Sequence, residues 1–165
     1  MVEQGLFEDS TMSEQGQEDV AIGIDLGTSV CRVAVWNCSE VELLSNSQEQ
    51  LLMKSFVSFK DQNHPKSGVT SPLANDYELF SGSIIYNIKR LLCIPVPDTD
   101  PKVLQSKYLF LVQSIELGAM QLIAPLVNGM WTSTTPEEAL AVLLNKIKDM
   151  AKTKLKCRVD HSCCI

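Results

Sequence analysis

Four residues at one short turn have the chemistry of a phosphate and magnesium site. Asp25 ends an apolar run that begins at Val20, Gly27 follows it, and Thr28 and Ser29 supply two hydroxyls. Backbone N–H groups at a glycine turn can approach and cradle anionic oxygens. A carboxylate at the end of a strand can hold Mg²⁺, usually through the water molecules of the metal. The spacing therefore predicts a phosphate-binding turn with Asp25 beside the metal.

The same turn also fits a simpler interpretation. In an ordinary hairpin, the side chains of Asp25 and Thr28 would do no more than bond to the amides of the turn. A second candidate, Lys89, stands beside Arg90, and paired bases usually form a solvated helix face. A lysine at a phosphate site would instead offset negative charge on a transferring phosphoryl group. Residue types and spacing alone leave these alternatives open.

The elements around the turn follow from periodicity. Short apolar runs on both sides of a glycine predict a hairpin, and further β-rich runs follow. We expect strands at 20–25, 30–37, 40–45 and 55–60, two short helices within 76–92, a helix at 101–108, and strands at 110–117 and 121–131. Pro125 should make the last of these an edge or bulged strand, because proline cannot donate to a ladder.

The clearest local signal is a helix start. Thr135 as N-cap, Pro136 at the first helical position and Glu138 three residues after the cap form a capping box. Apolar residues then recur at helical spacing as far as Leu155. This pattern predicts a helix that packs on the core and carries no site.

Composition limits the class of protein. The chain has 165 residues and a net charge of -6, and the acids of residues 1–19 account for all of that charge. A neutral remainder argues against a nucleic-acid surface, and no apolar run is long enough to cross a membrane. Six cysteines fit no zinc spacing. Residues 1–19 lack the features of a signal or transit peptide, so we expect a disordered acidic tail. The predicted location is the cytoplasm, with the nucleus as a further possibility.

The motif G-I-D-L-G-T-S at Gly23–Ser29 resembles the first phosphate loop of the actin-like ATPases. Four further segments are similar to the 70-kDa heat-shock chaperones within that superfamily: V-E-L-L-S-N-S-Q at 41–48, K-S-F-V-S-F-K-D at 54–61, I-K-R-L-L at 88–92 and T-P-E-E at 135–138. The similarity runs from about Val20 to Val159 and resembles a divergent plant-type branch. It implies an α/β fold, namely the first lobe of an actin-like (ribonuclease-H-like) ATPase domain, with a mixed sheet and packed helices. The resemblance further implies that this lobe is incomplete.

The resemblance also assigns roles to the candidate site residues. Asp25 would anchor the water shell of Mg²⁺, Gly27, Thr28 and Ser29 would contact the phosphates of ATP or ADP, and Lys89 would assist hydrolysis. Val30 replaces an aromatic residue that is frequent in the family. The partners implied are unfolded polypeptides and co-chaperones, and the activity is their ATP-driven binding and release.

The resemblance predicts a shortened family member. Residues 20–159 would form a partial nucleotide-binding domain, in which 20–53 and 136–159 make the core and 54–135 an insert. Residues 160–165 would be a divergent stub, leaving a sheet edge exposed to self-association, with Cys163 and Cys164 open to disulfides. Because the second lobe lies beyond residue 165, we expect the isolated chain to be inactive and to bind ATP more weakly than about millimolar. The alternatives are an interaction module or decoy for chaperone partners and a sugar-kinase-like protein.

Overall fold

The computed structural model of the chain describes residues 20–37, 39–59, 66–67, 83–92, 101–114, 119–126 and 129–164. The predicted acidic tail, Cys38 and the first part of the predicted 76–92 helices lie outside these ranges. No helix in the described part of the chain combines the length and the apolar character that a membrane span requires.

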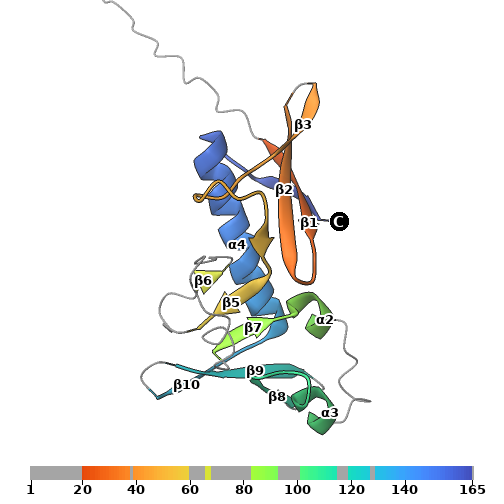
Figure 1. Cartoon of the computed structure of the whole chain (residues 1–165), viewed down its shortest axis with the longest axis vertical. Coiled ribbons are helices and arrows are strands. Elements are labelled where there is room, and N and C mark those ends of the chain that lie inside the picture. The colour runs from red at the N-terminus through yellow and green to blue at the C-terminus, as the bar shows by residue number, and fades with distance from the viewer. Residues whose placement is uncertain are drawn as a thin grey trace, which may run out of the picture.

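A mixed sheet forms the upper half of the molecule (Figure 1). Its strands are β1 (Ala21–Leu26), β2 (Val30–Asn37), β3 (Glu40–Leu43), β4 (Met53–Lys54) and β11 (His161–Cys164). The order is β11-β1-β2-β3, with β4 also paired to β2. β1 and β2 are antiparallel and β11 runs parallel to β1. The predicted hairpin and the α/β fold are therefore confirmed.

The helix α4 (Pro136–Leu155) runs along one face of this sheet (Figure 1). Its capping box is present: Glu138 N–H donates to Thr135 Oγ1 over 3.2 Å, and Thr135 N–H donates to Glu138 Oε2 over 3.0 Å. Its buried residues share the core with the inward side chains of the hairpin. These include Leu143 and Ile147 from α4, and Ile22, Ile24, Val33 and Val35 from β1 and β2.

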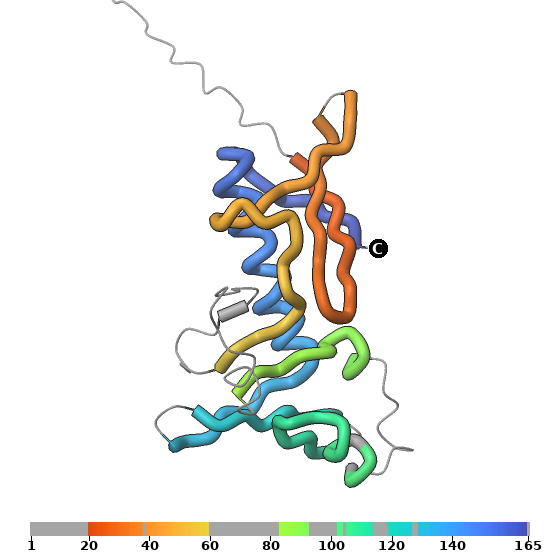
Figure 2. The backbone as a smooth tube through the Cα atoms, viewed as in Figure 1, coloured from red at the N-terminus to blue at the C-terminus, as the bar shows by residue number. Residues whose placement is uncertain are grey.

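Two smaller sheets lie below the hairpin (Figure 2). The first sheet consists of β5 (Phe56–Ser58), β6 (Lys66–Ser67) and β7 (Ile84–Tyr86), in the order β6-β5-β7. The second sheet consists of β8 (Leu111–Ser114), β9 (Met120–Pro125) and β10 (Trp131–Thr134), in the order β10-β9-β8. The short helices α2 (Ile88–Leu92) and α3 (Pro101–Gln105) accompany them. The rings of Tyr86, Tyr108 and Phe110 pack against one another where these elements meet, in tilted and edge-to-face pairs with centroids 5.0 to 5.9 Å apart.

Three sequence predictions are wrong. Ile84 lies on a strand, because the β-branched pair Ile84 and Ile85 completes the sheet of β5. Strand β9 is the central strand of its sheet, not an edge strand. Pro125 is tolerated there because it is the last residue of β9, where its missing N–H does not interrupt the ladder of hydrogen bonds. Residues 161–164 are more than the divergent stub expected at 160–165, because His161–Cys164 forms a strand that pairs in register with Ala21–Ile24.

Candidate functional site

The turn Gly27–Ser29 joins β1 to β2 and admits no side chain at its first position. A Cβ added to Gly27 would lie 2.2 Å from the backbone oxygen of Val30. Real Cβ atoms do not approach an oxygen so closely, so only glycine fits without moving the chain. The glycine that the sequence motif singled out is thus required by the path of the backbone. The tight turn at this glycine brings the hydroxyls of Thr28 and Ser29 to the end of the hairpin.

Ser55 holds this turn from the segment between β4 and β5. Its N–H donates to Ser29 O over 2.9 Å, and its Oγ donates to Gly27 O over 2.8 Å. The thiol of Cys31, fully buried beneath the turn, lies 3.0 Å from the same Oγ. Burial raises the pKa of Cys31 above its ordinary value of 9.0, although the bond to Ser55 opposes the shift. The buried thiol is therefore neutral at physiological pH and acts as part of the support.

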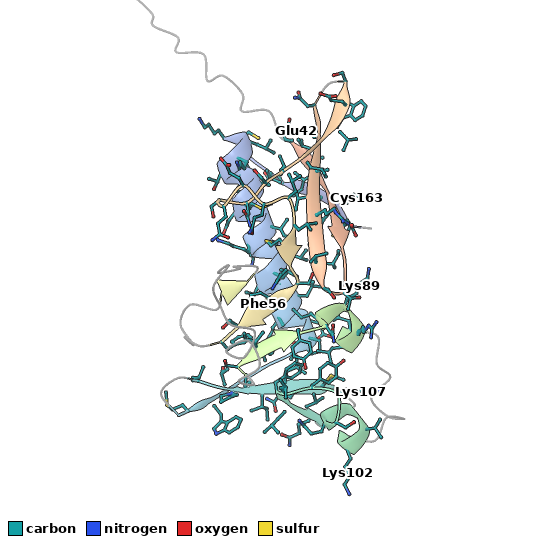
Figure 3. The ribbon with its side chains drawn as sticks, viewed as in Figure 1. Glu42, Phe56, Lys89, Lys102, Lys107 and Cys163 are labelled. Carbon is teal, nitrogen blue, oxygen red and sulfur yellow. The ribbon has the colours of Figure 1, made fainter. Side chains whose placement is uncertain are left out.

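Lys89 reaches the turn from a distant part of the sequence. Its Nζ donates to Leu26 O over 2.9 Å, joining residues 63 positions apart. Figure 3 shows Lys89 at the tip of the hairpin, on the side of α2 that faces solvent. Ile88 and Leu91, each 2% exposed, anchor α2 in the core. Since these anchors flank Lys89 in the short helix, they fix the position of its backbone beside the turn.

Asp25 projects from the face of the sheet opposite α4. Alternate residues of β1 point to opposite faces, and the inward positions are those of Ile22 and Ile24. The carboxylate of Asp25 pairs with Arg32, which lies directly across the hairpin, and Arg32 Nη1 is 3.1 Å from Asp25 Oδ2. Both side chains are about half exposed, at 53% and 49%. A ligand at the turn could therefore reach either group.

The structure brings all five predicted site residues to one end of the hairpin. Gly27, Thr28 and Ser29 form the turn, Asp25 precedes it, and Lys89 bonds to the residue between. Sequence reasoning missed two further residues, Ser55 and Arg32. Arg32 could have been found by counting across the predicted turn, because hairpin register places it opposite Asp25. Ser55 lies in the family-like segment 54–61, but its contact with the turn could not be predicted, since that contact depends on how this segment packs.

The residues present fit a phosphate group with a magnesium ion. A tight glycine turn, two hydroxyls and an ammonium group are donors for phosphate oxygens. A half-exposed carboxylate at the edge of that turn is the ligand type that Mg²⁺ takes, with its other positions filled by water. Among the described residues, Arg32 already donates to Asp25 Oδ2 and so competes with a metal for that oxygen.

Comparison with known proteins shows which family the chain resembles. The profile of the Hsp70 protein family matches residues 21–165. The chain belongs to the Hsp70 family. It is 47% identical over 150 residues to heat shock 70 kDa protein 8 of Arabidopsis thaliana, covering 90% of this chain and 26% of that protein. It is 30% identical over 142 residues to a heat shock 70 kDa protein of Neurospora crassa, covering 86% of this chain and 21% of the relative.

The Hsp70 match settles two predictions from the sequence. The resemblance to a plant-type branch is confirmed by the identity with the Arabidopsis relative. The expectation that similarity stops at Val159 is wrong, because the family profile extends through β11 to residue 165. The chain spans about a quarter of the length of these Hsp70 relatives, 26% and 21% of the two above.

Proposed function

We propose that this chain supplies the first phosphate-binding element of an ATP-dependent Hsp70 chaperone. The observation that carries the proposal is the bond of 2.9 Å between Lys89 Nζ and Leu26 O. It joins a lysine of α2 to the last residue of β1, directly before the glycine turn, although the two residues are remote in the sequence. A phosphate group at the turn would meet backbone N–H groups, two hydroxyls and an ammonium group together.

Each residue has a distinct task in this proposal. Gly27 lets the backbone approach the phosphate oxygens, and Thr28 and Ser29 donate hydroxyl hydrogen bonds to them. Lys89 places a positive charge where negative charge is spread over the phosphoryl oxygens. Asp25 would hold the water shell of Mg²⁺, which when bound neutralises part of the phosphate charge. Ser55 keeps the turn in the shape that these contacts require.

The activity of the whole protein would be the ATP-driven binding and release of unfolded polypeptides, together with co-chaperones. The relatives that support this proposal are heat-shock proteins about four times as long as this chain. By itself the chain should bind ATP more weakly than about millimolar, which corresponds to roughly -4 kcal/mol. A location in the cytoplasm stays a prediction.

Calorimetry with ATP on the wild-type chain and two lysine variants tests the proposal. Lys89→Ala should abolish the weak binding, because it removes the charge nearest the turn. Lys107→Ala is the matched control, since Lys107 is exposed and lies far from the hairpin tip (Figure 3). Equal binding by both variants would remove Lys89 from the site. Micromolar binding by the wild type would show that the site is more complete than we propose.

A second candidate function is an interaction module that needs no nucleotide. The observation in its favour is the apolar outer face of the sheet, where Trp36 is 64% and Val41 65% exposed. Chaperone-like suppression of aggregation of a denatured model protein, measured without ATP, distinguishes the two functions. Activity that Trp36→Ser removes and Lys89→Ala preserves would favour the interaction module.

A further inference from the structure

Arg32 lies in the candidate site but has no part in the proposed binding of phosphate and magnesium. It lies on β2 directly opposite Asp25, and the register of the hairpin fixes the two residues as a pair. Its guanidinium donates to Asp25 Oδ2 over 3.1 Å. Both side chains lie on the face of the sheet away from α4, beside the same surface hollow, which is also lined by Ala34 and Cys163.

The ion pair changes what Asp25 can do. The carboxylate proposed to hold Mg²⁺ already has a fixed positive charge on one oxygen. A divalent ion placed beside it would meet that charge within a few ångströms, and the repulsion weakens metal binding even in water. Asp25 therefore makes a poorer metal anchor than the same carboxylate without a basic neighbour.

The same arginine improves the site for phosphate without a metal. The planar fork of a guanidinium donates two parallel hydrogen bonds to a phosphate, and it remains charged at any physiological pH. Lys89 adds a second cation at the backbone oxygen of Leu26, the residue that follows Asp25. Two cations and one carboxylate leave a net positive charge around the turn, which is the balance that a metal-free polyphosphate requires.

We propose that Arg32 takes over part of the role of magnesium, so that this chain binds the metal-free nucleoside triphosphate at least as well as its magnesium complex. Arg32 is then a residue that determines specificity, held by Asp25 until the phosphates arrive. This inference rests on the proposed phosphate site. It goes beyond that site in stating which ionic form of the ligand the chain selects.

The test measures ATP affinity by NMR titration of the full chain, once in excess EDTA and once in excess Mg²⁺. The wild type should bind ATP in EDTA as tightly as in Mg²⁺, or more tightly. Arg32→Gln should weaken binding in EDTA by on the order of tenfold and reverse the preference toward the magnesium complex. Arg32→Lys keeps the charge and should fall between the two.

Arg158→Gln is the matched control, because Arg158 pairs with Asp160 in the same way but belongs to the connection between α4 and β11. It should leave both affinities unchanged. A wild type that binds the magnesium complex more tightly than metal-free ATP, or an Arg32→Gln chain with an unchanged preference, overturns the inference alone. If ATP shifts no resonance of the turn in either condition, the proposed phosphate site fails and the inference fails with it.

Discussion

Gly27 shows how one residue links the sequence motif to the site. Replacing it with alanine would bring a Cβ within 2.2 Å of Val30 O, and the backbone of the turn would have to move. We expect Gly27→Ala to cost about 1–3 kcal/mol of unfolding free energy, as forced overpacking does, and to abolish phosphate binding. Urea denaturation measures the loss of stability.

Gly23→Ala provides the control in the same strand. A Cβ on Gly23 would come no closer than 3.9 Å to Ala34 O, which is ordinary contact. Its midpoint of denaturation should stay close to that of the wild type. Equal effects of the two substitutions would mean that the turn tolerates a side chain at Gly27.

At the scale of elements, the connection from α4 to β11 depends on one acidic residue. Asp160 pairs with Arg158 Nη2 over 2.6 Å and with Lys148 Nζ over 3.6 Å. Burial alone would raise the pKa of Asp160, but these two bases lower it below its ordinary value of 3.8. The pKa is thus lower in the folded chain than in the unfolded chain.

The direction of the pH effect on stability follows from the lower pKa of Asp160 in the folded chain. The contribution of Asp160 is complete well above pH 3.8 and is lost as the pH falls through 3.8 and the lower folded pKa. We expect β11 amides to exchange faster below this range, measured by hydrogen exchange. Asp160→Asn should exchange faster at neutral pH and lose the acid dependence, whereas Asp149→Asn on α4 should behave as the wild type does.

Local patterns in the sequence were sufficient to predict the hairpin and α4. The hairpin is a glycine turn between two β-rich runs, and a complete capping box marks the start of α4. The strand β11 was missed because its partner, β1, is remote in the sequence and four exposed residues give no hydrophobic pattern. Ile84 was placed on a helix because its spacing to Leu91 and Leu92 fits a helical face, and only pairing with β5 decides otherwise. At the site, the turn residues came from their types, while the place of Lys89 came from a resemblance.

At the scale of the whole molecule, the central sheet has two open edges among the described strands. Every residue of β3 and of β11 is exposed, and each strand pairs with one neighbour only in the described part of the chain. The expected open sheet edge is therefore present among the described strands, on β11 and on β3. Unpaired N–H and C=O groups are a template for another chain.

We propose that the chain self-associates through these edges. Sedimentation velocity in reductant should show an average mass that rises with concentration. A double substitution, Cys163→Ser with Cys164→Ser, separates edge pairing from disulfide formation, because it removes the two exposed thiols of β11. Association that persists in this variant supports edge pairing. A monomer at every concentration in reductant would show that the sheet is closed in solution by other means.

The central claim is that the hairpin tip and Lys89 form one site for a chain of phosphates. The most direct test is a map of ¹H–¹⁵N chemical shifts, recorded with ATP, inorganic tripolyphosphate and adenosine in turn. We predict that ATP and tripolyphosphate shift the same resonances, those of residues 25–29 and Lys89, and that adenosine shifts none of them. Shifts by adenosine at the turn, or shifts by ATP that fall elsewhere in the molecule and spare residues 25–29, would contradict the claim.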